Sequence, residues 1–218
     1  MQLQTNAVLL ADGTRAAELV DAGLDEVFVS LHGCTAEVSD EVTGAPGTFA
    51  RTLEGVDNLA SLDVMLMLNF VICRRNMEQL PEYVRFVAQR WPAAFMTISF
   101  VAPSTDMVPR DRALIPRYSE ALPWLAEAAA EARRLGALLG GLEAMCGLPL
   151  CLVPPSLSRA DELTAIAAGF DQGEFVKGEQ CEGCDWRDRC YGLRRGYAEL
   201  YGDEELQRVT SGGAPEER

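Results

Sequence analysis

The stretch DVMLMLNFVIC, residues 63–73, decides the fold class, because it is the strongest β-strand pattern in the sequence. Its apolar run is interrupted by Asn69, an amide whose burial without a partner would cost about 1–3 kcal/mol. The run is far too short to span a lipid bilayer, which takes about 20 apolar residues in a helix. We therefore interpret it as a core strand with one polar position that needs an explanation.

Strands and helices alternate around this stretch. Short apolar runs predict strands, and runs with apolar residues at helical spacing predict helices. The predicted strands are residues 2–7, 26–33, 63–73 and 95–101. The predicted helices are residues 13–23, 48–62, 77–91 and 116–136. Four strands, each followed by a helix, predict an α/β fold with a parallel sheet and right-handed crossovers.

The composition changes along the chain. Pro, Gly and Cys become denser after Gly140, which predicts a core over residues 1–139 and a loop-rich appendage over residues 140–206. The small polar end of the sequence, residues 207–218, predicts a disordered tail.

Charge and the N-terminal residues restrict partners and location. The formal net charge of −14 repels phosphate backbones and anionic lipid, so we expect no nucleic acid and no membrane as partners. Met1 is followed by neither a basic segment nor a cleavage signal, so we expect a cytoplasmic protein. In a reducing cytosol, clustered cysteines indicate metal binding or catalysis rather than disulfides.

Three of the seven cysteines lie in the segment CEGCDWRDRC, residues 181–190. Cys181, Cys184 and Cys190 form a C-x2-C-x5-C pattern, which is too compact to be a chance grouping and indicates a metal site. Cys151, just before a Pro-Pro break, is the best candidate for the fourth ligand, and Cys146 is the second choice. Spacing alone leaves zinc and an iron–sulfur cluster open, because both accept four thiolates.

Several motifs together resemble the radical S-adenosylmethionine superfamily. The segments QTNA, VFVSLHG and LNFVICRRN occur in the order of a TNG-like turn, a serine-ended strand and an asparagine-bearing strand in that superfamily. The resemblance implies the third, fourth and fifth strands of a partial parallel (β/α)6 barrel. Residues 181–206 resemble C-terminal extensions of the SPASM type, which bind an auxiliary [4Fe–4S] cluster. The further cysteine expected three residues on is absent, which favours a single twitch-like cluster.

The chain departs from the superfamily at its start. It has neither the C-x3-C-x2-C loop, whose cluster cleaves S-adenosylmethionine, nor the glycine-rich motif that follows the second strand. We expect a truncation, in which two βα units and the cluster loop, roughly 80–100 residues, are missing. The resemblance then makes this chain the C-terminal portion of an enzyme, inactive by itself.

The resemblance also implies site residues and chemistry. Asn6, Ser30 and His32 lie at predicted strand ends, and Asn69 lies within the predicted strand 63–73. All four are the candidates for binding S-adenosylmethionine or substrate. The alternatives are a turn former for Asn6, strand-end capping for Ser30 and His32, and a backbone partner for Asn69.

The implied reaction is hydrogen abstraction by a 5′-deoxyadenosyl radical from an unknown substrate, either a peptide or a small molecule, with a reducing electron donor as partner. Two other classes stay open. The chain can be a non-catalytic iron–sulfur or electron-transfer partner, or a zinc-stabilised α/β module.

Overall fold

The computed structural model describes residues 1–103, 108–170 and 173–210. The chain divides into two compact units. The first, which we call the sheet unit, comprises Met1–Ile98 and Trp124–Gly140, and the second, the cysteine unit, comprises Ser99–Pro123 and Gly141–Arg218. Each unit is described by itself.

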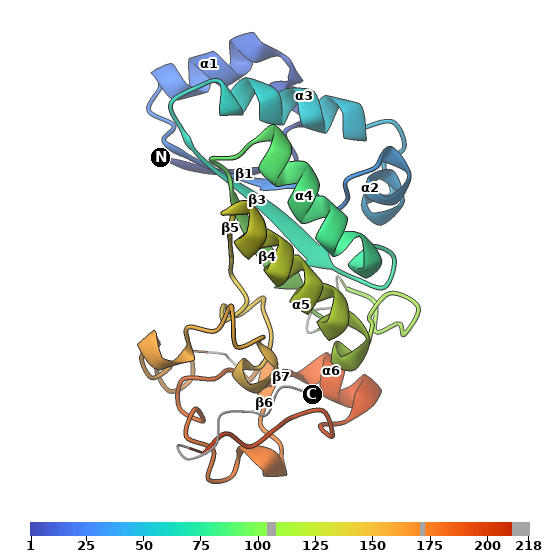
Figure 1. Ribbon diagram of the computed structural model, residues 1–218, viewed down its shortest axis with the longest axis vertical. Coiled ribbons are helices and arrows are strands. Elements are labelled where there is room, and N and C mark those ends of the chain that lie inside the picture. Colours follow the sequence, from blue (N-terminus) through green and yellow to red (C-terminus); the bar gives the residue numbers. More distant parts are fainter. Residues whose placement is uncertain (104–107, 171–172, 211–218) are drawn as a thin grey trace. The chain divides into compact units, whose positions relative to one another are not determined.

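The sheet unit is built on a five-stranded sheet whose spatial order follows the sequence (Figure 1). β1 pairs with β2, β2 with β3 and β4 with β5 in parallel, with Thr5 of β1 opposite Val29 of β2, and Thr97 of β4 opposite Gly140 of β5. The order β1-β2-β3-β4-β5 has no reversal, as in a segment of a (β/α) barrel. The strands are β1 (Gln2–Thr5), β2 (Glu26–Ser30), β3 (Met65–Ile72), β4 (Phe95–Phe100) and β5 (Leu138–Gly140).

Helices α1 to α5 lie between successive strands of the sheet along the chain, whereas α6 follows the last strand. Most follow the predicted pattern, and Pro81 sits at the start of α4, where its missing N–H costs nothing. The helices are α1 (Gly13–Asp21), α2 (Ala36–Thr43), α3 (Phe49–Ala60), α4 (Leu80–Arg90), α5 (Tyr118–Leu135) and α6 (Arg195–Tyr201). Short 3-10 turns occupy Val8–Ala11, Met77–Gln79, Leu150–Leu152, Ala160–Glu162 and Glu179–Cys181. No helix in the described part of the chain is long and apolar enough to cross a lipid bilayer.

The α/β class and the parallel sheet are confirmed, with two additions. Helix α2 and strand β5 were not predicted. Thr35 accepts a hydrogen bond from the Val38 N–H at the start of α2, and Gly44 ends it with φ 64°. Both are ordinary helix boundary signals, whereas β5 has only three residues and carries too short a pattern to recognise.

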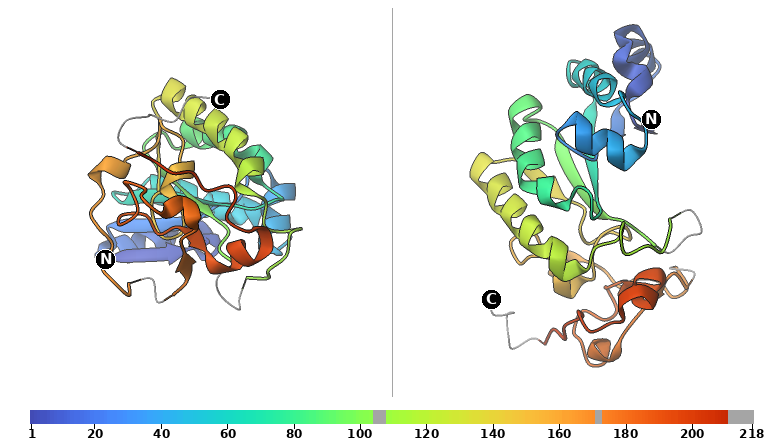
Figure 2. Two further views of the ribbon diagram at one scale, coloured as in Figure 1. Left: turned by 90° about the horizontal axis from the view of Figure 1, so that it is seen from below. Right: turned by 90° about the vertical axis from the view of Figure 1, so that its right-hand side faces the viewer.

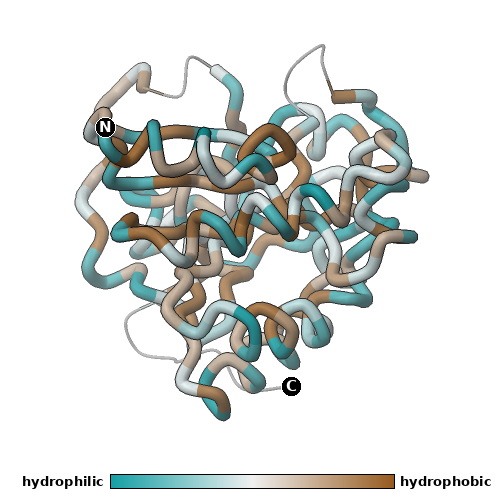
Figure 3. The backbone as a smooth tube through the Cα atoms, turned by 90° about the horizontal axis from the view of Figure 1, so that it is seen from above, coloured by the Kyte–Doolittle hydropathy of each residue, from teal (hydrophilic) through white to brown (hydrophobic). Residues whose placement is uncertain are grey.

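One face of the sheet forms the core of the sheet unit. Val27 lies opposite Leu66 and Val29 opposite Leu68, and all four side chains are buried. Hydrophobic and hydrophilic residues alternate along the helices in Figure 3, the pattern of elements that bury one side. The alternate strand positions, such as Ser30, point to the other face and are less buried.

A tight turn follows β1 and fixes the position of Asn6. Ala7 is fully buried and has φ 59°, a conformation that non-glycine residues adopt rarely. The turn packs against α3 at Gly55, where a Cβ atom would overlap the Ala7 carbonyl oxygen. The Thr52 hydroxyl donates a hydrogen bond to the Asn6 carbonyl at 3.1 Å. The QTNA segment is therefore a built turn, held by helix α3.

The cysteine unit has little regular structure among its described residues. Besides α6 it contains an antiparallel pair of short strands, β6 (Phe175–Val176) and β7 (Leu193–Arg194), and otherwise mostly loops (Figure 2). Its core is aromatic: the rings of Tyr118 and Tyr197 stack at 4.0 Å, and the Tyr118 N–H donates to the Tyr197 hydroxyl at 2.9 Å.

The ordered chain continues into the segment predicted as a disordered tail. The Gln207 N–H donates to Cys151 Sγ at 3.4 Å, and the Asp185 N–H donates to the Val209 carbonyl at 2.9 Å. Residues 207–210, the start of the predicted tail, therefore lie in the described part of the chain, and two of them contact Cys151 and the segment 181–190. Residues 211–218 lie outside the described part of the chain.

Candidate functional site

Four cysteines line one small cavity in the cysteine unit. They are Cys151, Cys181, Cys184 and Cys190, the set predicted from the sequence. Cys151 comes from the 3-10 turn Leu150–Leu152, and the other three come from the C-x2-C-x5-C segment. Thus the fold brings a residue about 30 positions away to the compact cysteine segment.

The C-x2-C segment forms a tight turn. Gly183 has φ 69°, which a glycine adopts without strain. The Cys184 N–H donates to the Cys181 carbonyl at 3.3 Å, and the Arg187 N–H donates to the Cys184 carbonyl at 3.1 Å. The turn places Cys181 and Cys184 on the same cavity, as the spacing predicts.

Backbone N–H groups point at the sulfur atoms. Cys190 Sγ accepts hydrogen bonds from Leu150 at 3.4 Å and from Gly192 at 3.3 Å. Cys151 Sγ accepts one from Gln207 at 3.4 Å. Donors of this kind stabilise a thiolate, and hydrogen bonds to sulfur tune the potential of iron–sulfur clusters.

Burial opposes ionisation of the same thiols. It raises the pKa of Cys151 to about 12, with an added contribution from the neighbouring thiols of Cys190, Cys181 and Cys184. Burial also raises the pKa of Cys190, while the hydrogen bonds from the N–H groups of Leu150 and Gly192 and the charge of Lys177 lower it. Metal ligation requires the thiolate, so a bound cation would offset the effect of burial on these thiols.

The donor set fits a metal centre with four thiolate ligands. The cavity itself measures about 10 Å³, room for one water-sized group. Within the described ranges, no group of three or more Cys, His, Asp and Glu side chains is arranged to hold a single ion. Four thiols on one cavity favour a metal centre although the cavity volume is small, because rotation of the cysteine side chains changes the volume of so small a cavity.

The remaining cysteines lie elsewhere. Cys146, the second choice for the fourth ligand, is exposed and does not line the cavity; its Sγ lies 3.8 Å from a nitrogen of Arg194. In the sheet unit, Cys73 is 3% exposed, and burial raises the pKa of the Cys34 thiol to about 11.

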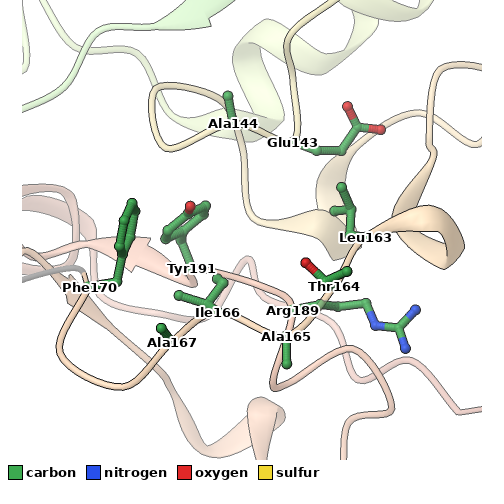
Figure 4. Close-up of a pocket in the computed structure, with 10 residues that line it drawn as sticks. All are labelled: Glu143, Ala144, Leu163, Thr164, Ala165, Ile166, Ala167, Phe170, Arg189 and Tyr191. Carbon is green, nitrogen blue, oxygen red and sulfur yellow. The ribbon is translucent and has the colours of Figure 1, made fainter.

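A larger pocket, of about 540 Å³, flanks the cysteine segment (Figure 4). Arg189 and Tyr191, on either side of Cys190 in the sequence, contribute to its wall. Its charged groups are already engaged: Glu143 accepts a hydrogen bond from the Arg159 N–H at 2.6 Å, and Arg189 donates to the Ala160 carbonyl at 3.1 Å. What the pocket offers is mainly an apolar wall, made of Leu163, Ala165, Ile166, Phe170 and Tyr191.

The four strand-end candidates lie at one edge of the sheet unit. Ser30 and Asn69 are direct neighbours across β2 and β3, at or near the carboxyl ends of these strands. Asn6 follows the last residue of β1, which pairs with the residue before Ser30, and His32 comes two residues after Ser30. In parallel α/β sheets this edge is where ligands bind.

Two of these residues, Asn6 and His32, accept hydrogen bonds from backbone N–H groups and so have structural roles. Asn6 is exposed, and its side-chain oxygen accepts a hydrogen bond from the Val8 N–H at 3.2 Å. His32 Nδ1 accepts one from the Val71 N–H at 3.3 Å. Burial lowers the pKa of His32, so its imidazole is neutral near pH 7. Asn69 is 7% exposed.

A further amide at this edge, Asn76, was not among the predicted site residues, although its side chain makes three hydrogen bonds. Asn76 precedes the 3-10 turn Met77–Gln79 without a side-chain capping bond to it, and its side-chain oxygen accepts from the Cys73 N–H at 2.8 Å. It donates to the carbonyls of Val71 at 2.9 Å and His32 at 3.0 Å. Trp186 and Gln207 were also missed at the cysteine cavity. The Asn76 position gave no signal, because its partners are assembled only by the fold.

Curated relatives match parts of the chain, although no family model matches it. An AdoMet-dependent heme synthase of Methanosarcina barkeri is 28% identical over 131 residues, which are 60% of this chain and 37% of the relative. A probable GTP 3',8-cyclase of Sulfolobus acidocaldarius is 33% identical over 89 residues, 40% of this chain and 28% of the relative. A PqqA peptide cyclase of Rhodopseudomonas palustris is 39% identical over 82 residues, 38% of this chain and 22% of the relative.

The chain therefore spans less than two fifths of the length of each of these relatives. Its homologues are members of the radical S-adenosylmethionine family, and each match to them is partial.

Proposed function

We propose that this chain is the C-terminal portion of a radical S-adenosylmethionine enzyme and holds an auxiliary [4Fe–4S] cluster through Cys151, Cys181, Cys184 and Cys190. The observation that carries the proposal is that these four thiols line one cavity, although one of them comes from a separate segment. The homologues support iron–sulfur chemistry in general.

In this proposal the cysteine unit provides ligands and a fixed environment for the cluster. The N–H groups of Leu150, Gly192 and Gln207 hold two of the sulfur atoms in place. Lys177, Trp186 and Leu206 line the cavity and limit the access of water to it. When bound, the cluster supplies a one-electron acceptor or a binding point for substrate.

The sheet unit contributes the carboxyl edge of β1, β2 and β3 to the cofactor site. We assign Ser30 and Asn69 to direct contact with S-adenosylmethionine or substrate, because they are neighbours at that edge. Asn6 and His32 shape the edge, since each already bonds a backbone N–H. The chemistry that the cofactor supplies to the whole protein is hydrogen abstraction, from a peptide or a small molecule.

A structural zinc site is the second candidate, and one observation favours it. The cavity of about 10 Å³ is closer to the size of one ion than to that of a four-iron cluster. In that case the four thiolates would hold zinc tetrahedrally at about 2.3 Å and would stabilise the loops of the cysteine unit.

Anaerobic purification with iron, acid-labile sulfide and zinc analysis tests the proposal. The wild-type chain should carry about four irons and four sulfides, and Cys184→Ala should lose them. Cys146→Ala is the matched control, because Cys146 lies in the same unit but not on the cavity, and it should retain them. One zinc per chain without sulfide would replace the cluster by the zinc site, and metal-free protein would refute both.

A further inference from the structure

Cys151 differs from the other three cysteines in what lies behind it. A pocket of about 380 Å³, which we call the outer pocket, adjoins the cysteine cavity. Four residues line both: Leu150, Cys151, Trp186 and Gln207. The cysteine cavity, but not the outer pocket, is lined by Cys181, Cys184 and Cys190. Cys151 therefore lies between the cysteine cavity and the outer pocket, which is large enough for a small molecule.

The attachment of Cys151 is also different. Cys190 Sγ accepts two backbone N–H bonds and belongs to the compact cysteine segment. Cys151 Sγ accepts one, from the exposed Gln207, and its segment lies about 30 residues earlier in the chain. Removing Cys151 would leave three ligands in one segment that still surrounds the centre.

The charges around the outer pocket balance. Its lining includes two guanidinium groups, Arg159 and Arg208, and two carboxylates, Asp161 and Glu162. Arg159 and Glu162 form an ion pair at 2.7 Å. The pocket therefore selects a ligand by size rather than by charge, and it admits a small neutral molecule.

We propose that this outer pocket is an access site through which a small soft ligand, such as a thiol, reaches the metal centre at the Cys151 position. Cys151 is then the exchangeable ligand, and the other three are permanent. The inference rests on the proposed metal centre. In the exchange, the bond between the metal and Cys151 breaks and a bond between the metal and the sulfur of the entering thiol forms. The Cys151 thiolate takes up the proton that the entering thiol loses, and no electron is transferred.

Chemical rescue of a cavity variant tests this assignment. Cys151→Gly removes the side chain that separates the two pockets, and Cys190→Gly is the matched control on the inner wall. Both are reconstituted anaerobically with iron and sulfide, with and without 2-mercaptoethanol. The readouts are metal and sulfide content and the electron paramagnetic resonance spectrum of the reduced protein.

We expect Cys151→Gly to bind a cluster with an altered spectrum, and 2-mercaptoethanol to restore the spectrum and content towards wild type. Cys190→Gly should gain nothing from the thiol. Three outcomes would overturn the inference while wild type still holds a cluster: no rescue of Cys151→Gly, equal rescue of Cys190→Gly, or a Cys151→Gly spectrum that equals wild type without thiol. A wild-type chain without iron and sulfide would instead remove the proposed cluster itself.

Discussion

The two units of the chain reach an ordered state by different means. The sheet unit has a five-stranded ladder and a continuous aliphatic core in which Val27, Val29 and Leu68 are fully buried. The described cysteine unit has two two-residue strands, the seven-residue helix α6, the first part of α5, three 3-10 turns and long loops, with four thiols on one cavity. Backbone hydrogen bonds and apolar burial suffice for the first unit, whereas loops with few such contacts gain most from a metal crosslink.

The largest effect should come from removing the proposed metal centre. Cys184→Ala, or a chelator on the wild-type chain, should make the segment around residues 141–210 strongly sensitive to protease, because structural metal sites supply about 10 kcal/mol or more to small domains. The sheet unit should stay resistant. Limited proteolysis with mass spectrometry locates the cuts.

Cys146→Ala is the control for that experiment and should resemble wild type. If the cysteine unit resists protease equally well without metal, the contrast between the units is wrong, and the aromatic core of Tyr118 and Tyr197 would suffice to hold it.

The sheet unit should instead be sensitive to loss of its core. Leu68→Ala removes a side chain with 0% exposure and should lower the free energy of unfolding by about 2–5 kcal/mol. Urea unfolding followed by circular dichroism measures the loss. Met65→Ala, on the same strand but 62% exposed, is the control and should change stability by less than about 0.5 kcal/mol. Equal effects of the two substitutions would contradict the assigned faces of β3.

A polar connection should matter less than the core. Asn76→Ala leaves the Cys73 N–H and the carbonyls of Val71 and His32 without their amide partner. We expect a loss of about 1–3 kcal/mol in the same urea assay. Asn6→Ala is the comparison, since Asn6 is exposed and its side chain makes one local bond; its effect should be clearly smaller.

The smallest effect is a pH dependence of the sheet unit. Burial lowers the pKa of His32, so the unfolded state binds a proton at higher pH than the folded state. Stability from this group is complete above about pH 6.5 and falls as the pH drops towards the lowered pKa. Urea unfolding at pH 7.5 and 5.5 should show a larger loss for wild type than for His32→Asn, whose amide oxygen can replace Nδ1. Identical losses would assign the pH dependence to other groups, since His32 is the only histidine.

The same contrast explains how far the sequence predicts the structure. The strands of the sheet unit follow from apolar runs, because a buried parallel strand needs little beyond its own residues to be recognised. Strand β5 has three residues and shows no such run. Asn76 could not be assigned its partners, because they come from three different backbone positions that meet only in the fold.

In the cysteine unit, local spacing predicted Cys181, Cys184 and Cys190, because a turn of fixed length brings them together. Cys151 was chosen for its place before a Pro-Pro break, and the fold places it on the same cavity. The bond from Gln207 to Cys151 and the outer pocket behind it depend on contacts between segments about 50 residues apart. No local pattern encodes such contacts.

X-ray absorption at the iron and zinc edges of the anaerobically purified chain is the most direct test of the proposed iron–sulfur cluster, because it identifies the metal and counts its sulfur neighbours. We expect an iron signal with sulfur ligands and neighbouring iron atoms, lost in Cys184→Ala and altered in Cys151→Gly. A zinc signal with four sulfur atoms at about 2.3 Å and no iron would contradict it and would make the four cysteines a structural site.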